Sequence, residues 1–552
     1  MKRKRNHPLL LLMLASLPAI AQEEMTPVWE LRLEHKANLV GTDPNEGPGL
    51  NYAASDKEIT VMDKESGKVL WSKAYKELAP NLRKIDELVP FWQSGCIFLF
   101  DRKMGKDQIG VVDMRTGALL WTSEKYQNLS EDNVMYIKER DAFCISMKDA
   151  LHYVIARTGE EKWSTSTFKG TVGKYLFMPD GKVVMVNFVP DGLGALFTGF
   201  KNQIAKVDLD KGSIEWEATY IGRAERKVLT GEFLYDLNAD GDRVYLMLNG
   251  VQVYDYKSGA QLWSAAFDFT PDGIKGRPAN AVKWGVYGGV AQPVTVGDDL
   301  YVLDCVNRRK QFLKKYDRRS GKLLWTSPEI PDAKAIPGIY VNGDRVVLQI
   351  GGQVETQAYI RRTERNPDGT TQVVTIQRIE WINVKPCGLK AFNTTDGSMV
   401  WESERFKKGI TNAFIEGDLL HVCSGKALYA MDPSTGAERY EVPLGDDNIS
   451  DATNILPNGD QVVVIGEKGV STHNRADGKL VHSGKYKAAR FRARYGDMVL
   501  LETERDDIAA FDLKDCSFKQ YNNRAGAINQ LSYNGAFVYV YDKKDVLKLK
   551  TH

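Results

Sequence analysis

Apolar residues along this chain come in short runs that alternate with polar positions and end at glycine-containing turns. In one stretch the runs occupy residues 410–415, 419–423 and 427–431, and turns with Gly417 and Gly425 separate them. Alternation over so few residues is typical of half-buried β-strands joined by hairpins. A fourth run follows each such group. This gives four short antiparallel strands in about 40 residues, the size of one propeller blade.

A nine-residue phrase joins the third run to the fourth and recurs along the chain. It starts with Asp, carries a small polar residue and Gly at its fourth and fifth places, and ends in Trp. Clear copies occupy residues 63–71, 113–121, 208–216, 255–263 and 317–325. Residues 393–401 have Asn for Asp, residues 155–163 have Ile155 in the Asp place, and the copies from residue 432 onward decay. Repeats at this spacing indicate stacked units of one architecture.

Each recurring place in the phrase has a physical task. Asp accepts hydrogen bonds from nearby backbone groups and nucleates a turn, and Gly adopts the positive φ of a tight hairpin with a bulge. Trp falls on the outgoing strand, where burying about 150–250 Å² contributes at most roughly 4–6 kcal/mol. Eight of the eleven Trp residues take this place and are predicted to dock one unit on another: Trp29, Trp71, Trp121, Trp163, Trp216, Trp263, Trp325 and Trp401.

The two ends of the chain complement each other. Residues 27–33 form an outgoing strand with no unit before it, whereas residues 528–533, 536–541 and 546–550 form three strands that lack a fourth. We therefore expect the N-terminal strand to complete the last blade and cover its edge. The predicted fold is an all-β propeller of about eleven four-stranded blades. Since propellers typically have four to eight blades, two smaller rings are the alternative to the single wide ring that we favour.

The phrase at residues 317–325 resembles the repeat of the pyrroloquinoline-quinone (PQQ)-type β-propeller family, and the nearest type is the noncatalytic outer-membrane assembly factor BamB. The resemblance covers nearly the whole chain after residue 21 and implies the fold. It leaves the function open, because the same blade serves dehydrogenases, assembly factors and sensor domains. A dehydrogenase of this family usually has an adjacent Cys pair against PQQ and an acidic residue at a calcium ion. This sequence has no adjacent Cys pair, so no cofactor is expected, with PQQ and calcium as the alternative.

The first residues have the pattern of a secretory signal peptide. Residues 2–5 are basic, residues 9–17 are apolar, and small residues precede a predicted cleavage before Gln22. The apolar part is shorter than a membrane span needs. We expect residues 22–552 to be periplasmic or secreted, without a transmembrane segment and without the N-terminal Cys of a BamB-type lipoprotein. Removal of four basic residues changes the formal charge from +2 to −2, which carries no nucleic-acid signature.

The six cysteines lie far apart in different units and form no CxxC pair. An even number of cysteines in an exported chain permits disulfides. Free, buried thiols are nevertheless favoured, because Cys packs as a small hydrophobe and four of the six lie inside apolar runs: Cys96, Cys144, Cys305 and Cys423.

Three units are longer than the repeat requires, and loops on a rigid scaffold often carry binding. Residues 191–203 interrupt the second and third strands of the fourth unit. Their apolar residues would dock a partner or a membrane surface, or else pack on the blade edge. The candidates are Leu193, Phe197 and Phe200.

The second long segment, residues 267–293, is rich in glycine and carries Trp284 and Tyr287. It is predicted to be either a plain long loop or a lid over the channel, which would bind a glycan or another small ligand.

The third and largest insertion covers residues 353–384. Polar and apolar residues alternate on both sides of a turn at residues 366–369, which predicts a long hairpin arm with Arg361 and Arg362 near its tip. This arm would either bind a partner protein or simply be solvated.

Two other motifs are weaker signals of a binding site. Residues 236–241 mimic a calcium loop, but Met247 stands where the bidentate Glu should be, so a turn is favoured. A basic cluster between Arg308 and Arg319 is interpreted as a solvated edge rather than an anion site. The sequence predicts a noncatalytic exported propeller that scaffolds envelope proteins. A glycan-binding propeller and a divergent PQQ-dependent dehydrogenase are the alternatives.

Overall fold

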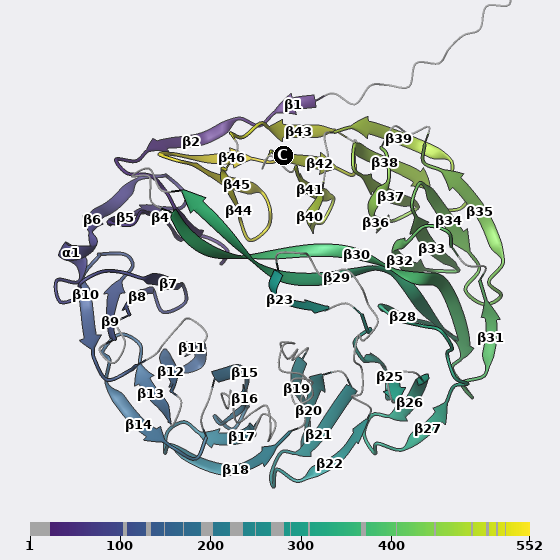
Figure 1. Ribbon diagram of the computed structural model, residues 1–552, viewed down its shortest axis with the longest axis horizontal. Helices are drawn as coiled ribbons and strands as arrows, with labels where there is room; N and C mark the ends of the chain where they lie inside the picture. The colour runs from purple at the N-terminus through teal and green to yellow at the C-terminus, as the bar shows by residue number, and fades with distance from the viewer. Residues whose placement is uncertain are drawn as a thin grey trace, which may run out of the picture.

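The structure, a computed structural model, arranges eleven antiparallel sheets around one ring (Figure 1). It confirms the predicted all-β propeller and its eleven blades. It describes residues 22–552 except 103–106, 128–133, 148–149, 169–170, 189–202, 221–235, 249, 266–280, 287–288, 307–309, 366–370, 404–405, 446–448, 487–489, 504–506, 515–516 and 525.

The first five blades follow the chain in order. Blade 1 contains β3 (Leu39–Thr42), β4 (Leu50–Ala54), β5 (Glu58–Asp63) and β6 (Val69–Ala74). Blade 2 contains β7 (Glu87–Phe91), β8 (Cys96–Asp101), β9 (Gln108–Asp113) and β10 (Leu119–Ser123). Blade 3 contains β11 (Val134–Ile137), β12 (Ala142–Ser146), β13 (Leu151–Ile155) and β14 (Glu161–Thr165). Blade 4 contains β15 (Thr171–Phe177), β16 (Val183–Phe188), β17 (Gln203–Asp208) and β18 (Ser213–Thr219). Blade 5 contains β19 (Asp236–Asp240), β20 (Arg243–Leu248), β21 (Gly250–Asp255) and β22 (Gln261–Ala265).

The remaining blades continue around the ring. Blade 6 contains β24 (Val294–Val296), β25 (Asp299–Val306), β26 (Lys310–Asp317) and β27 (Leu323–Thr326). Blade 7 contains β28 (Gly338–Asn342), β29 (Arg345–Arg365), β30 (Thr371–Asn393) and β31 (Met399–Glu402). Blade 8 contains β32 (Ile410–Glu416), β33 (Leu419–Ser424), β34 (Ala427–Met431) and β35 (Glu438–Pro443). Blade 9 contains β36 (Ala452–Asn458), β37 (Gln461–Gly466), β38 (Gly469–Asn474) and β39 (Leu480–Lys485). Blade 10 contains β40 (Arg490–Tyr495), β41 (Met498–Glu502), β42 (Ile508–Asp512) and β43 (Phe518–Tyr521).

Blade 11 is built from both ends of the chain. Its strands are β44 (Ile528–Leu531), β45 (Phe537–Asp542), β46 (Asp545–Lys550) and the N-terminal β2 (Pro27–Arg32), which pairs antiparallel with β46. The predicted closure of the last blade is therefore confirmed. A strand that the sequence did not predict, β1 (Gln22–Glu24), adds in parallel to β43 of blade 10.

Strands account for nearly all the regular structure that is described. The helical elements are α1 (Tyr75–Leu78), which follows β6, and the short 3₁₀ helix η2 (Lys138–Arg140). The core lies between neighbouring blades, because each sheet buries both of its faces. Between blades 2 and 3, for example, the rings of Phe98 and Phe143 pack edge to face with their centroids 4.6 Å apart.

Candidate interaction face

Blade 11 and blades 1 to 7 each carry a Trp on the outer strand that packs on the phrase glycine of the next copy of the phrase. Six of these eight indoles also donate a hydrogen bond to the next blade, whereas the indole N–H groups of Trp29 and Trp263 have no partner among the described residues. The Trp71 indole donates a hydrogen bond of 3.0 Å to the carbonyl of Met114, the residue that follows Asp113 in the next copy of the phrase. Trp325 bonds in the same way to Thr394, at 2.9 Å. Four other phrase positions repeat the contact: Trp121 with Ala156, Trp163 with Leu209, Trp216 with Tyr256 and Trp401 with Pro433.

The glycine of the phrase makes room for that indole. Gly117 has a φ of 63° and lies under the Trp71 ring, where an added Cβ would approach the ring to 2.8 Å. Only glycine therefore fits both the backbone conformation and the close approach. The decayed copy in blade 8 keeps the arrangement with another aromatic ring, because the Tyr440 hydroxyl donates to the carbonyl of Arg475 at 3.0 Å.

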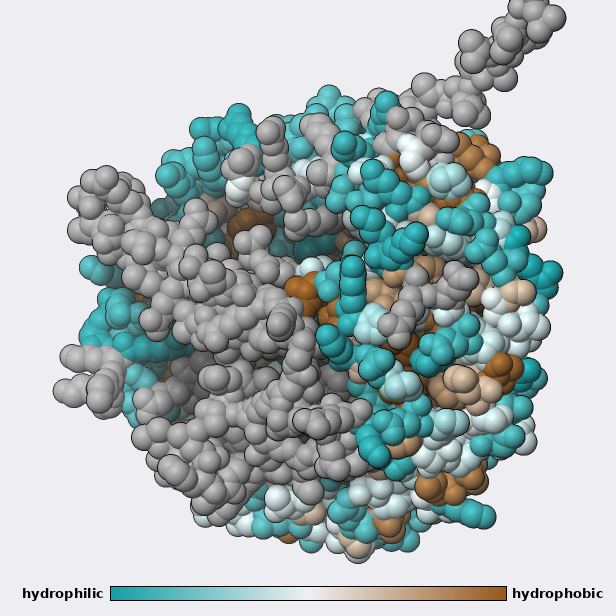
Figure 2. Space-filling view, turned by 45° about the vertical axis from the view of Figure 1, so that its right-hand side comes forward, coloured by the Kyte–Doolittle hydropathy of each residue, from teal (hydrophilic) through white to brown (hydrophobic). Residues whose placement is uncertain are grey.

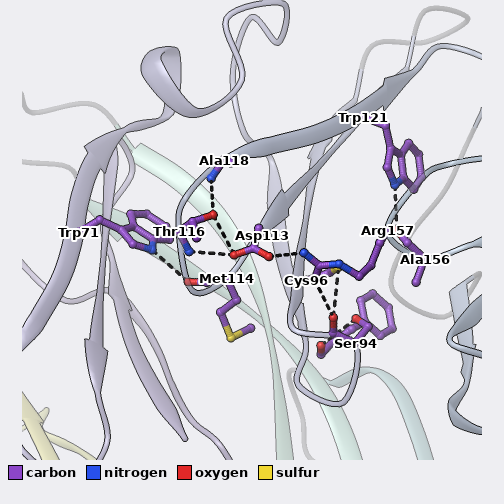
Figure 3. A network of polar contacts seen from close by, with 11 residues as sticks. Trp71, Ser94, Cys96, Asp113, Met114, Thr116, Ala118, Trp121, Ala156 and Arg157 are labelled. Carbon is purple, nitrogen blue, oxygen red and sulfur yellow. Dashed lines mark hydrogen bonds and ion pairs between the residues drawn. The ribbon is translucent and has the colours of Figure 1, made fainter.

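The imperfect copy of the phrase in blade 3 is compensated by an ion pair (Figure 3). Ile155 there cannot cap its turn with a carboxylate, but Arg157 of the same turn reaches back to Asp113 of blade 2. Burial opposes the charge of Asp113, yet hydrogen bonds from Arg157 and Thr116 hold the pKa of its carboxyl below the usual range. Both docking bonds, from Trp71 and Trp121, flank this ion pair. The turn network is thus a structural joint.

The topology gives the ring two different faces. In an antiparallel four-stranded blade, the turns between strands one and two and between strands three and four lie at the same end. The docking phrases join strands three and four, so they all lie on this docking face. Turns between strands two and three, and the connections to the next blade, lie on the opposite end, which we call the insertion face.

The parts of the insertions that the structure describes belong to the insertion face. Residues 189–202 connect β16 to β17, the second and third strands of blade 4, and residues 266–293 connect blade 5 to blade 6. The largest insertion extends β29 and β30, the second and third strands of blade 7. Among the described residues, the largest elaboration, the arm with β23, therefore lies on one side of the ring.

The arm formed by β29 and β30 pairs without interruption from Gly352 opposite Val384 to Arg365 opposite Thr371. It is the hairpin that the alternation predicts. Viewed down the ring axis, the arm leaves blade 7 and crosses the ring toward the side of β4 and β46 (Figure 1).

A bulge directs the arm away from its blade. The register shifts between Ile350 and Gly352, where Gly351 and Gly352 have φ values of 63° and 99°. An added Cβ on Gly352 would lie 2.5 Å from the carbonyl oxygen of Ile410, so the backbones here pass too close for a side chain. Such bulges bend strands and change the direction of the chain beyond them.

One side of the arm base is anchored and the other is exposed. Val354 and Val384 are buried with Ala335 in a small apolar cluster, against which Ile382 packs. On the neighbouring position of β30, Trp381 is 61% exposed. Sequence reasoning missed Trp381, although its place within an alternating strand outside the phrase was a usable signal.

The glycine-rich segment contributes a strand to the arm. β23 (Ala281–Val286) pairs antiparallel with β29, and Trp284 lies opposite Ala358. This part of residues 267–293 is therefore neither a plain loop nor a separate lid, because the long exposed edge of β29 supplies backbone partners for it.

Three of the seven candidate binding residues lie in the small sheet formed by β23 and the arm. Arg361 and Arg362 lie in β29, opposite Thr375 and Val374. Trp284 is the third candidate whose backbone is described, in β23 of the same small sheet. The remaining candidates lie outside the described residues: Leu193, Phe197, Phe200 and Tyr287.

The described members of the basic cluster of blade 6 are paired with neighbouring acids, while Arg308 and Arg309 lie outside the described residues. Lys315 lies 2.7 Å from Asp299, and Arg318 lies 2.9 Å from Asp240. Further pairs join Lys310 to Glu329, Lys314 to Asp304 and Arg319 to Asp298. Local ion pairs thus favour the interpretation as a solvated edge over an anion site.

The calcium-like motif is a strand and a turn. Asp236 begins β19 and pairs in register with Met247 of β20. The Asp236 carboxylate lies 3.0 Å from the Nζ of Lys174. Within the described residues, no group of three or more His, Cys, Asp or Glu side chains is placed to hold a metal ion.

The described cysteines are free and buried, as predicted: Cys96, Cys144, Cys305, Cys387 and Cys423. Burial raises the pKa of Cys144 to about 12, so this thiol stays protonated. His421 is likewise fully buried, and its burial lowers the pKa of the imidazole to about 4. These groups belong to the core.

Two surface depressions lie among the described residues. The first, of about 690 Å³, lies between blades 10 and 11, where Arg32 pairs with Asp545 at 2.9 Å and Arg524 lies 3.5 Å from Asp542. The second, of about 280 Å³, is on the docking face beside Trp92. Four of the charged residues that line the first depression form these two pairs.

The outer wall exposes single apolar residues just before the docking Trp residues. They include Leu70, Leu323, Leu324, Met399 and Val400. Figure 2 brings part of this wall forward and shows its apolar patches separated by hydrophilic residues. Scattered exposure of this kind is ordinary for a protein surface. In the described part of the chain, no helix has the length and apolar character to cross a membrane.

Comparison with family models supports the repeat family that the docking phrase indicates. A family model described as outer membrane protein assembly factor BamB matches residues 105–273 and 388–532, which is more than half of the chain. No curated protein matches. Among solved structures, BamB from Moraxella catarrhalis shares 16% identity and a TM-score of 0.29, covering 84% of this chain and 100% of its own. The computationally designed Ika8 protein shares 13% identity and a TM-score of 0.34, covering 70% of this chain and 97% of its own.

Proposed function

This chain belongs to the BamB family of outer membrane protein assembly factors, and on that premise we propose that it is a noncatalytic, exported scaffold that binds other proteins in the cell envelope. The arm of blade 7 is the proposed binding element. The ring supplies a rigid support, and its insertion face holds the partner.

One observation carries this proposal, namely the separation of tasks between the two faces. The docking face is occupied by the Trp and Gly joints that hold the ring together. The insertion face carries the segments that the ring does not need, including a hairpin whose strands run to Arg365 and from Thr371. Segments that a scaffold displays without using them for its own stability are typical binding elements.

The experiment compares the full chain with a shortened variant. Gln353 and Asn383 are paired across the hairpin, so residues 354–382 can be replaced by Asn-Gly, which closes a two-residue turn between them. Quantitative recovery of proteins from an envelope extract is measured with both chains. We expect the proteins that the full chain recovers to fall about tenfold or more with the shortened arm, a loss of about 1.4 kcal/mol of binding free energy.

A matched control changes an exposed apolar site away from the insertion face. Met399 and Val400 lie on the outer strand of blade 7, 50% and 40% exposed, and both are replaced by Ser. Recovery should stay unchanged in this variant. Equal recovery by all three chains would contradict the proposal, and so would the absence of any protein specific to the full chain.

The alternative functions stay predictions from the sequence. A screen for thermal stabilisation by glycans tests the binding of a small ligand. Addition of PQQ and calcium, followed by the absorbance of the cofactor, tests the dehydrogenase alternative.

A further inference from the structure

The arm has two long edges, and they differ in their pairing. β23 covers one edge by pairing with β29 between Thr356 and Ile360. On the other edge, β31 pairs with β30 only from Lys390 to Phe392. Within the part of the chain that the structure describes, no strand pairs with β30 from Thr371 to Val384 on the side away from β29.

The composition of this edge does not protect it from pairing with a strand of another molecule. Seven of the twelve residues 371–382 are Val, Ile or Thr, and none is Pro, Gly or Lys. Proteins normally blunt an exposed edge by keeping it short or by adding Lys, Pro or a bulge. The outer strands of the blades follow that rule, since β27 has four residues and β18 has seven.

This protein already accepts added strands at two other edges. β23 pairs antiparallel with β29, and β1 pairs in parallel with β43. Both additions use segments from outside the four-stranded blade. The unpaired edge of β30 offers the same row of backbone N–H and C=O groups, over a longer distance.

Trp381 supplies a side-chain anchor next to this edge. It is 61% exposed, whereas Ile382 and Val384 pack toward the buried cluster of the arm base. Trp is enriched among the residues that dominate protein interfaces. A large exposed indole beside an open strand edge thus combines backbone recognition with an apolar contact.

We propose that the edge of β30 between residues 371 and 383 is a strand-addition site that binds an extended segment of another protein, with Trp381 packing against that segment. The inference rests on the proposed scaffold function and names its partner class. An extended peptide is favoured because its backbone matches the spacing of the edge. A second copy is disfavoured, because the arm crosses its own ring (Figure 1) and pairing two arms would bring two rings together.

The test uses the full chain and a synthetic peptide of alternating Thr and Val residues, with Lys at both ends. Hydrogen exchange resolved to single amides is measured across residues 371–383. Without peptide, exchange should alternate between slow amides, bonded to β29, and fast amides on the open edge. With peptide, the fast amides should slow at least about tenfold, and Trp381 emission should move to shorter wavelength, as burial of its indole requires.

Three controls define the site. A helical peptide of Ala, Glu and Lys should change nothing, and the chain with residues 354–382 replaced by Asn-Gly should not bind the extended peptide. Trp381→Ala should weaken binding of the extended peptide about tenfold. The amides bonded to β29 should still exchange slowly in this variant, which would show that the arm is folded.

Three results would overturn the proposal. The first is slow exchange of the edge amides in the absence of peptide. The second is exchange that stays fast when the extended peptide is added. The third is peptide binding by the chain with the shortened arm. A doubled mass by light scattering, together with slowed edge amides, would assign the edge to self-association instead. If shortening the arm abolishes recovery of envelope proteins but those proteins leave the edge amides fast, the scaffold function stands and strand addition fails.

Discussion

The docking face and the insertion face of this ring show how one repeat can serve two purposes. On the docking face, the same contact recurs in six blades, because an indole must fit a glycine turn and reach one carbonyl. On the insertion face, the turns bear no such constraint, and they vary from tight hairpins to a long arm. The strand ends that carry the docking turns hold the ring together. The opposite strand ends have no such role, so inserted segments can be accommodated there.

The largest effect is expected from removing the segment that closes the ring. Deletion of residues 22–34 takes away β1, β2 and the buried Met25 and Leu33. The loss should exceed the roughly 3–5 kcal/mol expected for one buried Trp, because two sheets lose a strand. Hydrogen exchange should accelerate first between Val538 and Val546. Uniform acceleration around the ring would contradict a local closure.

Removal of one docking ring should come next. Trp325 is 8% exposed and bonds to Thr394, so Trp325→Ala should lower the free energy of unfolding by about 3–5 kcal/mol. Urea denaturation measures it. Trp381→Ala is the matched control, since that exposed indole should cost less than about 0.5 kcal/mol. A cost below about 1 kcal/mol at Trp325 would refute the docking role.

The contribution of the glycine contact can be isolated with two alanine variants. Gly397 and Gly417 have φ values of 74° and 63°, but only the added Cβ at Gly397 meets a neighbour, the ring of Trp325. Gly417→Ala should cost about 1–2 kcal/mol from its backbone conformation alone. Gly397→Ala should cost a further 1–3 kcal/mol or so, from displacement of the ring. Equal losses of unfolding free energy in urea denaturation would show that the Trp325 indole moves aside without a measurable loss of stability.

A smaller, pH-dependent effect is expected at the joint between blades 2 and 3. The folded-state pKa of Asp113 lies below its ordinary value, so its contribution is present above the unfolded pKa and is lost as the pH falls through the folded pKa. Arg157→Gln should therefore destabilise the protein at pH 7 by about 1 kcal/mol or less, and the difference should vanish in strong acid. A double-variant cycle with Asp113→Asn measures the coupling. A cost that does not change with pH would exclude the ion pair as its cause.

The smallest effect on stability should come from the insertion face. Replacement of residues 362–374 by Asn-Gly, which closes a turn between the paired Arg361 and Thr375, shortens the hairpin but keeps the buried Val354, the pairing of β23 and the joints of every blade. We expect the thermal midpoint to change by only about 1–2 °C, since surface changes usually stay within about 0.5 kcal/mol. Scanning calorimetry measures it. A fall like that of Trp325→Ala would mean that the arm supports the ring and that the two faces are not independent.

The sequence predicted the blades well because their signals are local. Alternation, Asp-Gly turns and the place of Trp all lie within one unit, and so does the arm around residues 366–369. The partners of those residues lie in other units, which spacing alone cannot reveal. For this reason the sequence does not predict that the Trp71 ring packs on Gly117.

The candidate site was harder to predict because edges choose their partners in three dimensions. β23 lies in a glycine-rich segment with weak strand signals, and only the arm gives it a partner. Trp381 looked like one more residue of an alternating strand. The link from Arg157 to Asp113 had one visible hint, the Ile155 that replaces the expected Asp.

Blade 11 has a consequence for the order in which the molecule can be completed. Arg32 and Asp545 are neighbours in space although 513 positions separate them. During synthesis from the N-terminus, residues 27–32 have no partner strand until β46, near the end of the chain, has been made. Partly made chains hold an unsatisfied strand throughout this interval, and such strands are prone to aggregate. Premature termination anywhere before β46 would therefore leave the whole circle open rather than shorten it by one sector.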